Sequence, residues 1–137
     1  TLFRSASRFT ASRFDPAKTV GVIVPYRRQI ALIRQALAEI PELSAVQEGI
    51  TIDTVERYQG SQRDVIIYSF AVTHGYQLDF LTATTFTDDD GTEIDRKLNV
   101  ALTRARRQMI VIGRPDLLQH IPLFRQLMET GRTIVKF

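Results

Sequence analysis

Guanidinium groups are concentrated in one short segment of this chain. Residues 96–107 read RKLNVALTRARR, and an apolar stretch over residues 109–113 follows almost at once. Arginine suits phosphate recognition because its charge is permanent and its planar fork can donate two parallel hydrogen bonds to an oxyanion. Cations near the carboxyl end of a helix can also merely complement the helix dipole, which contributes roughly 0.3 to 1 kcal/mol each. On this segment alone, both interpretations stay open.

A second polar segment lies between two apolar runs. Residues 53–64 read DTVERYQGSQRD. Ligands of open α/β sheets gather at the carboxyl ends of the strands, and the glycine at position 60 would let a phosphate or a nucleotide approach the backbone closely. The alternative is an ordinary connection in which Gly60 supplies a left-handed turn and Asp53 or Asp64 caps a helix. Taken alone, the segment favours the ordinary connection.

The pattern of apolar residues predicts the elements that must position these two segments. Runs of β-branched residues predict strands, and apolar residues spaced three and four apart predict helices. The expected strands are 20–24, 50–55, 65–70 and 109–113, and residues 133–137 could form a last one. The expected helices are 28–40, a short helix in the arginine segment that buries Leu98, Ala101, Leu102 and Ala105, and one or two over 117–128, interrupted near Pro122. Such alternation implies an α/β fold of three layers, with a mainly parallel sheet flanked by helices on both faces.

Two segments depart from this alternation. Residues 1–18 mix Arg, Ser, Thr and Phe without a clear period, so we expect a connector from a preceding domain and assign residues 19–137 to the domain itself, within a longer protein. Residues 73–95 are polar, and we expect an exposed loop there. Part of that loop is similar to a calcium-binding loop, but Phe86 and Lys97 stand where the first and last carboxylate ligands belong. We therefore do not expect calcium binding.

Composition excludes several classes of protein. The chain has 137 residues, of which 44% are hydrophobic and 24% are charged, as expected for one domain with a sizeable core. It has no cysteine, which rules out disulfides and zinc-thiolate sites, and its two histidines stand apart, so we expect no metal site. No apolar run approaches the roughly 20 residues that span a bilayer, and no apolar block of a signal peptide is present, which predicts a cytoplasmic protein.

Three segments, in this order, closely resemble motifs IV, V and VI of the superfamily 1 helicases. They are residues 20–29 (VGVIVPYRRQ), 54–67 (TVERYQGSQRDVII) and 98–106 (LNVALTRAR). The resemblance covers residues 20 to about 115 and is best to the branch of RNA-decay and replication helicases that move 5′ to 3′. It implies a RecA-like lobe of the P-loop NTPase type, the second lobe of such a motor. The alternation of strands and helices predicts the same kind of fold.

The resemblance also implies roles for individual residues. The arginine at the position of Arg104 reaches the γ-phosphate of ATP as a catalytic arginine finger in this family. The ATP-binding positions carried over are Gly60, Gln62, Arg104 and Arg106, and the nucleic-acid-binding positions are Pro25, Tyr26, Thr54, Val55 and Gln59. Family members often carry glutamate at the position of Gln62, and a glutamine keeps the hydrogen bonding but loses the charge. For Tyr26, packing in the core is an alternative to stacking on a base.

The residues that this chain lacks set the expected mechanism. It has no G-x-x-x-x-G-K-[ST] loop and no paired acidic motif for magnesium, so it cannot assemble a P-loop ATPase site by itself. The resemblance implies that ATP and Mg²⁺ are held mainly by an N-terminal RecA-like lobe of the same polypeptide. The implied partner is single-stranded nucleic acid; DNA is favoured over RNA, and the sequence does not decide between the two. We expect an ATP-dependent helicase in the full-length protein and no ATP hydrolysis by the isolated chain.

A non-catalytic nucleic-acid-binding or interaction module, derived from a helicase lobe, is the alternative function. The sequence upstream of Thr1 would discriminate the two, because a lobe with a phosphate-binding loop favours the helicase.

Overall fold

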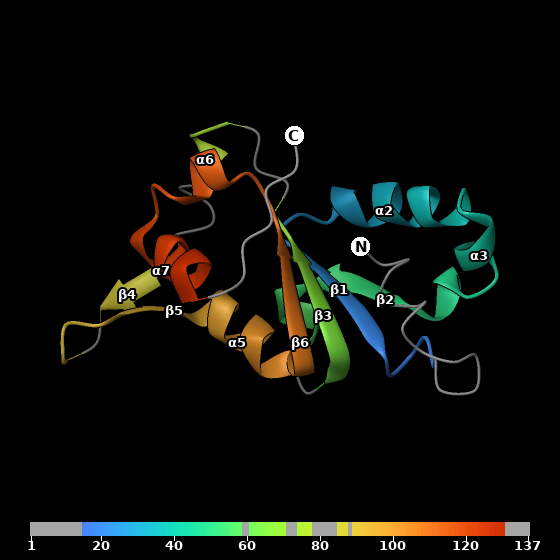
Figure 1. The fold of residues 1–137 in the computed structure, drawn as a ribbon, viewed down its shortest axis with the longest axis horizontal. Coiled ribbons are helices and arrows are strands. Elements are labelled where there is room, and N and C mark those ends of the chain that lie inside the picture. The colour runs from blue at the N-terminus through green and yellow to red at the C-terminus, as the bar shows by residue number, and fades with distance from the viewer. Residues whose placement is uncertain (1–14, 59–60, 71–73, 78–84, 88, 131–137) are drawn as a thin grey trace.

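A four-stranded parallel sheet forms the centre of this chain (Figure 1). The computed structural model describes residues 15–58, 61–70, 74–77, 85–87 and 89–130. The strand order is β2-β1-β3-β6, and every neighbouring pair is parallel. The strands are β1 (Val20–Val24), β2 (Thr51–Thr54), β3 (Arg63–Ser69) and β6 (Ala105–Ile112). The predicted α/β class and the predicted parallel sheet are confirmed.

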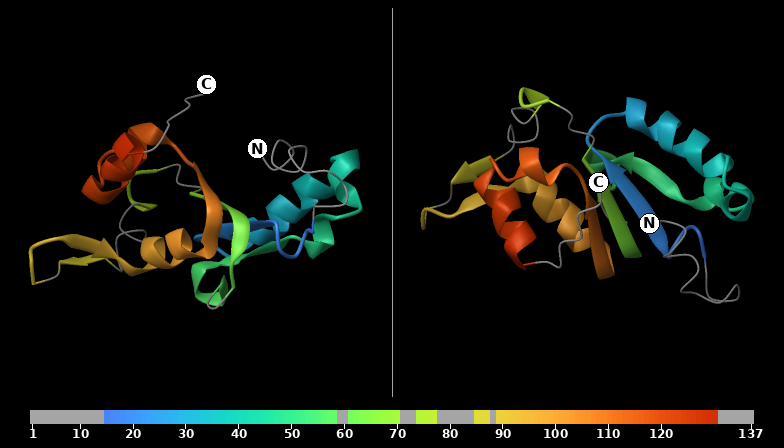
Figure 2. Two further views of the ribbon diagram at one scale, coloured as in Figure 1. Left: turned by 60° about the horizontal axis from the view of Figure 1, so that its bottom comes forward. Right: turned by 45° about the horizontal axis from the view of Figure 1, so that its top comes forward.

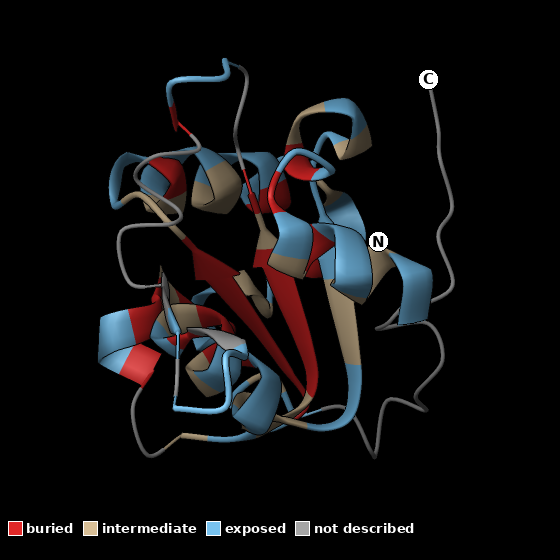
Figure 3. Cartoon of the chain, turned by 90° about the vertical axis from the view of Figure 1, so that its left-hand side faces the viewer, coloured by how far each residue is buried: buried red, intermediate tan, exposed pale blue. Residues whose placement is uncertain are grey.

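The two central strands are continuous apolar runs because both of their faces are covered. All five residues of β1 are buried, and so are residues 65–68 of β3. Parallel strands covered on both faces need such runs, rather than an alternation of apolar and polar residues. The edge strand β6 differs, since Val111 and Ile112 are 38% and 42% exposed. Figure 3 shows the contrast, with the central strands coloured as buried and β6 as intermediate or exposed.

Helices cover both faces of the sheet and complete the three predicted layers. On one face, Leu37 and Leu43 pack against β1, β2 and β3, and on the other face Leu98, Ala101 and Phe124 pack against β1, β3 and β6. Figure 1 shows the two helical layers on opposite sides of the strands. The first layer contains α2 (Arg28–Ala38), α3 (Pro41–Ser44) and the 3₁₀-helix η1 (Gln47–Gly49). The second contains the 3₁₀-helix η2 (Val55–Tyr58), α5 (Arg96–Arg104), α6 (Pro115–Leu118) and α7 (Pro122–Thr130).

Proline and aspartate explain where several of these helices begin. The Asp95 side chain caps α5 by accepting a hydrogen bond from the backbone N–H of Leu98 at 3.0 Å. Pro115 and Pro122 each open a helix, at positions where the missing N–H would have no intrahelical partner. The predicted interruption near Pro122 is therefore confirmed. None of the helices within the described ranges is long and apolar enough to cross a membrane.

The arginine segment forms a shorter helix than its pattern predicts. α5 ends at Arg104, and β6 begins at Ala105, which pairs with Arg63 of β3. Pairing with β3 thus converts the end of the predicted helix into strand. The predicted buried stripe is correct for Leu98 and Ala101, but Leu102 is 38% exposed and Ala105 lies outside the helix.

The predicted loop over residues 73–95 is wrong in its second half. Strands β4 (Thr85–Thr87) and β5 (Glu93–Asp95) form an antiparallel hairpin. Gly91 in its turn has a φ of 79°, a conformation that favours glycine. Figures 1 and 2 show the hairpin projecting away from the sheet, next to the start of α5. The strand expected over residues 133–137 lies outside the described residues.

Gly21 of β1 leaves the space that the Tyr58 hydroxyl occupies. Tyr58 is 1% exposed, and its hydroxyl donates to the backbone carbonyl of Thr51 at 2.6 Å. A Cβ atom at position 21 would overlap this hydroxyl and would lie 3.0 Å from the ring atom Cζ of Tyr58. Burial raises the pKa of Tyr58 to about 12, so the phenol stays neutral and keeps donating at ordinary pH. This contact holds η2 against β1 and β2.

We expect Gly21→Ala to lower the free energy of unfolding of the 137-residue chain by about 1 to 3 kcal/mol, the usual cost of overpacking. Urea denaturation measures the change. In the Tyr58→Phe background the same substitution should cost less, because the hydroxyl that it would strike is gone. An equal cost in both backgrounds would show that the Tyr58 hydroxyl does not set the requirement for glycine.

Candidate functional site

The direction of the strands divides the predicted site residues between two edges of the sheet. Pro25 and Tyr26 follow β1 directly, and Thr54 and Val55 end β2 and begin η2, so these four gather at the carboxyl edge. Gln62, Arg104 and Arg106 lie at the amino edge, where β3 and β6 begin. Gln59 and Gly60 lie outside the described residues.

The polar segment 53–64 therefore lies at both edges of the sheet, as part of the connection between β2 and β3 that the segment alone favours. Because β2 and β3 both run parallel to β1, the chain that joins them must return from the carboxyl edge to the amino edge. η2 makes this return, so that Thr54 stays at one edge and Gln62 reaches the other.

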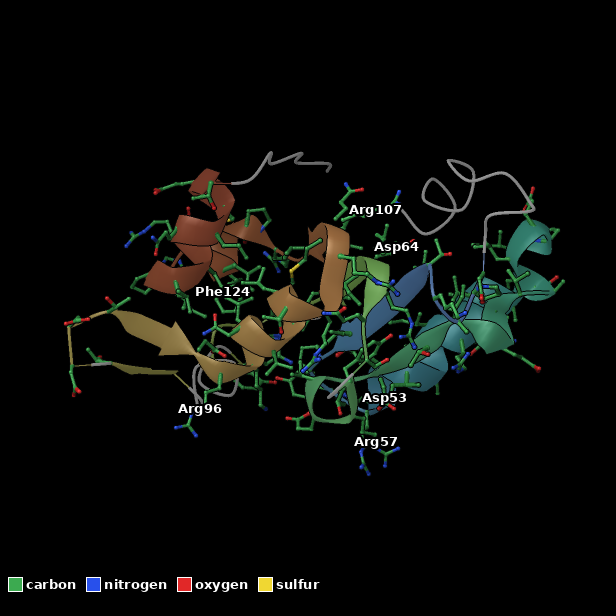
Figure 4. The ribbon with its side chains drawn as sticks, turned by 90° about the horizontal axis from the view of Figure 1, so that it is seen from below. Asp53, Arg57, Asp64, Arg96, Arg107 and Phe124 are labelled. Carbon is green, nitrogen blue, oxygen red and sulfur yellow. The ribbon has the colours of Figure 1, made fainter. Side chains whose placement is uncertain are left out.

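Helix α5 connects the two edges. Near its start, the Lys97 ammonium lies 3.0 Å from Oε1 of Glu56, which belongs to η2 next to Val55. At its end, the Gln62 side-chain amide donates to the carbonyl of Thr103 at 3.3 Å. Seen from the amino edge (Figure 4), Arg96 lies at the outer end of α5 beside the β4–β5 hairpin, away from Asp64 and Arg107. α5 thus runs antiparallel to the strands.

Arg104 is the last residue of α5, at the amino edge, and its guanidinium forms no ion pair with a described carboxylate. The side chain is half-buried, and its Nε is buried without a hydrogen-bond partner in the described part of the chain. A buried donor left without a partner costs about 1 to 3 kcal/mol, a cost that an approaching oxyanion would relieve. Arg106 differs, because its Nε lies 3.7 Å from Oδ1 of Asp64. Of Arg104 and Arg106, Arg104 is the one that forms no ion pair with a described carboxylate of this chain.

Arg63 anchors the segment that carries Gln62, a role that sequence reasoning missed. Its Nη1 donates to the Ser61 hydroxyl at 2.6 Å and to the Gln62 carbonyl at 2.8 Å. Its Nη2 donates to the Thr51 hydroxyl at 2.9 Å, and its guanidinium lies 5.8 Å from the centroid of the Tyr58 ring. The side chain of Arg63 therefore ties residues 61 and 62 to β2 and η2. Nothing in the local sequence distinguishes it from the other arginines.

Gln62 donates a hydrogen bond that a glutamate at this position could not donate. Its amide group donates to the carbonyl of Thr103, next to Arg104. An ionised carboxylate can only accept hydrogen bonds, so a glutamate would repel this carbonyl rather than bind it. The departure from the usual motif V residue thus gives this chain a link between segment 61–64 and α5.

At the carboxyl edge, a shallow hollow lies between η2, α5 and α7. Its floor is apolar, and Glu56, Asp95 and Lys97 supply the polar groups around it. The apolar lining consists of Val24, Pro25, Val55, Tyr68, Phe70 and Phe124. Tyr26 lies beside it, half-buried, with the guanidinium of Arg28 5.7 Å from its ring centroid. Pro25 and Val55, two of the predicted nucleic-acid-binding residues, are thus brought together.

Three hydrogen-bond donors surround the carboxylate of Glu56 and determine its charge. Partial burial raises the pKa of this group, but hydrogen bonds from its own backbone N–H, from Lys97 and from the Thr54 hydroxyl outweigh that effect. The net result is a pKa below the ordinary value of 4.5, so Glu56 is ionised at neutral pH. Sequence reasoning missed the pairing of Glu56 with Lys97, because the two residues lie far apart in the sequence.

We expect the Glu56 carboxylate to stabilise the chain above about pH 4.5, its ordinary pKa, and to lose this contribution as the pH falls through its lowered pKa in the folded state. The wild-type chain should therefore melt at a higher temperature than Glu56→Gln at pH 7, and the difference should shrink towards pH 3. Circular dichroism melts across this range measure it. As a control, Glu42→Gln on α3 removes an exposed carboxylate elsewhere. A difference between wild type and Glu56→Gln that does not change with pH would contradict the prediction.

Comparison with known proteins shows which family this chain resembles. Residues 2–116 match the family model described as AAA domain. DNA polymerase alpha-associated DNA helicase A of Saccharomyces cerevisiae is 32% identical over 76% of this chain and 13% of its own length. The DNA replication ATP-dependent helicase/nuclease DNA2 of Bos taurus is 32% identical over 80% of the chain and 9% of its own length. Regulator of nonsense transcripts 1 of Dictyostelium discoideum is 33% identical over 80% and 8%. The chain spans only a small part of each of these relatives.

Proposed function

This chain belongs to the superfamily 1 helicases as one of their RecA-like domains, and from that premise we propose that it is the second, C-terminal motor lobe of an ATP-dependent helicase. In this proposal the first lobe of the same polypeptide holds ATP and Mg²⁺, and the present lobe supplies an arginine finger and part of the surface that binds a single strand. In each of the three relatives described above, the segment similar to this chain is a small part of a longer protein, which supports a two-lobed motor in one polypeptide.

The state of Arg104 is the observation that carries the proposal. Its Nε is buried and unpaired within the described residues, and no described carboxylate pairs with its guanidinium. Arg106 lies beside a carboxylate, and Arg63, whose Nε is also unpaired, binds three oxygen atoms through Nη1 and Nη2. A guanidinium that is not paired within its own lobe can stabilise the charge that develops on a transferred phosphoryl group. Gln62 and Arg63 support it indirectly, because they fix the segment that packs against the end of α5.

Each edge of the sheet then has its own ligand. The amino edge, with Gln62, Arg104 and Arg106, faces the nucleotide that the first lobe holds. The carboxyl edge, with Pro25, Tyr26, Thr54 and Val55, faces the nucleic acid. Hydroxyl and backbone N–H groups there contact phosphates without reading the sequence. The names of two of the three relatives specify DNA, which favours single-stranded DNA over RNA.

We expect Arg104→Ala to reduce ATP turnover by the full-length protein about 10³-fold or more, the usual contribution of an arginine finger. Coupled-enzyme measurement of phosphate release tests this. Arg125→Ala, which removes an exposed arginine from α7, serves as the matched control and should leave turnover within about twofold. Turnover by Arg104→Ala that equals the control would remove Arg104 from the proposed role, provided that both variants show the wild-type circular dichroism spectrum.

We expect Thr54→Val to weaken the binding of an unstructured oligonucleotide about tenfold, because a hydrogen bond to a charged group contributes roughly 1.5 to 3 kcal/mol. Fluorescence anisotropy with labelled DNA and RNA of equal length measures the affinity and also compares the two nucleic acids. The control is Thr130→Val on α7, where the hydroxyl donates to the carbonyls of Gln126 and Leu127 in its own helix. If Thr54→Val binds as tightly as this control, Thr54 does not contact the strand.

A further inference from the structure

The donors around the Glu56 carboxylate form a cradle that would fit other oxyanions. The Lys97 ammonium lies 3.0 Å from Oε1, and hydrogen bonding from the Thr54 hydroxyl and from the backbone N–H of Glu56 helps to lower the pKa of this group. Thr54 ends β2, Glu56 belongs to η2, and Lys97 belongs to α5. A charged donor and two neutral donors that converge on one oxyanion are the groups that proteins use to bind phosphate.

The position of the cradle points to the ligand. It lies at the carboxyl edge, next to Pro25 and Val55, with which Glu56 and Lys97 line the same hollow. Lys97 stands in the first turn of the nine-residue helix α5, where the helix dipole favours an anion. The nearby Asp95 carboxylate opposes an anion, but it is 2% exposed and already accepts the Leu98 N–H as the helix cap.

The Glu56 carboxylate can leave the cradle more easily than the donor groups can. The side chain of Glu56 is 57% exposed, whereas that of Lys97 is 28% exposed. Rotation of the Glu56 side chain would bring its carboxylate into water, while Lys97 and Thr54 stay in place on their own elements. An ion pair with this degree of exposure contributes little to stability, so its loss would oppose the exchange only weakly.

We propose that Thr54, the backbone N–H of Glu56 and Lys97 form a binding site for a backbone phosphate of single-stranded nucleic acid, and that the Glu56 carboxylate fills this site until the strand arrives. The inference rests on the function proposed above and adds two residues to it. Lys97 is a phosphate ligand, and Glu56 is a competitor that lowers the affinity for the strand. The exchange breaks and forms only hydrogen bonds and ion pairs.

Opposite effects of two charge-removing substitutions test this inference. In the full-length protein, Glu56→Gln should bind a labelled oligothymidylate several-fold more tightly than wild type, because the competing charge is gone. Lys97→Gln should bind it about tenfold more weakly or worse, and the slope of log affinity against log salt should become shallower by about one. Fluorescence anisotropy over a range of potassium chloride concentrations gives both quantities.

Charge-matched controls separate a local site from the general field of the protein. Glu42→Gln and Lys18→Gln remove one exposed charge of each sign elsewhere and should each change the affinity less than about twofold. A merely structural ion pair would make Glu56→Gln and Lys97→Gln shift the affinity in the same direction, and that result would overturn the phosphate site. Failure of the wild-type protein itself to bind the strand would overturn the proposed function and this inference with it.

Competition by inorganic phosphate distinguishes a strand phosphate from a free one. At equal ionic strength, potassium phosphate should displace the oligonucleotide no better than potassium chloride does, because a single phosphate lacks the neighbouring contacts of a strand. Displacement by phosphate that is specific in wild type and absent in Lys97→Gln would assign the site to a free phosphate group and overturn the assignment to nucleic acid.

Discussion

Parallel pairing of the strands is the constraint on which the arrangement of this lobe depends. Every connection between two parallel strands must return from the carboxyl edge of the sheet to the amino edge. Between β2 and β3 the chain makes this return through one 3₁₀-helix, and between β3 and β6 it returns through α5. Residues that are neighbours in one motif are therefore carried to opposite edges. The contact between Tyr58 and β1 is possible only because Gly21 lacks a side chain.

The pattern of apolar residues was sufficient to predict the centre of the fold. β1 and β3 are buried on both faces, so their β-branched runs could belong only to interior strands. The pattern failed where pairing with distant residues decides the structure. Ala105 continues the helical spacing and residues 106–108 are polar, yet this segment forms strand because Ala105 and Gln108 pair with β3. The Asp90-Gly91 pair, typical of a hairpin turn, was the sign of β4 and β5 that the polar composition obscured.

The sequence names candidate site residues, but it does not give their arrangement. Resemblance to helicase motifs identifies Arg104 and Thr54 one by one, because each motif is continuous in the sequence. The pairing of Lys97 with Glu56 and the hydrogen bond from Gln62 to Thr103 both join residues that lie far apart in the sequence, and the fold alone brings them together. The role of Arg63 is likewise invisible in the sequence, since its three oxygen partners include Thr51 on another strand.

The length of α5 has a consequence for timing in a two-lobed motor. Nine residues at a rise of about 1.5 Å each form a rod of roughly 13 Å, short enough to move as one stiff body. Lys97 and Arg104 are fixed to opposite ends of that rod, so a shift of the whole helix that displaces one also displaces the other. In the proposed motor, such a shift would couple the proposed phosphate ligand to the proposed arginine finger without any intervening rearrangement of the sheet.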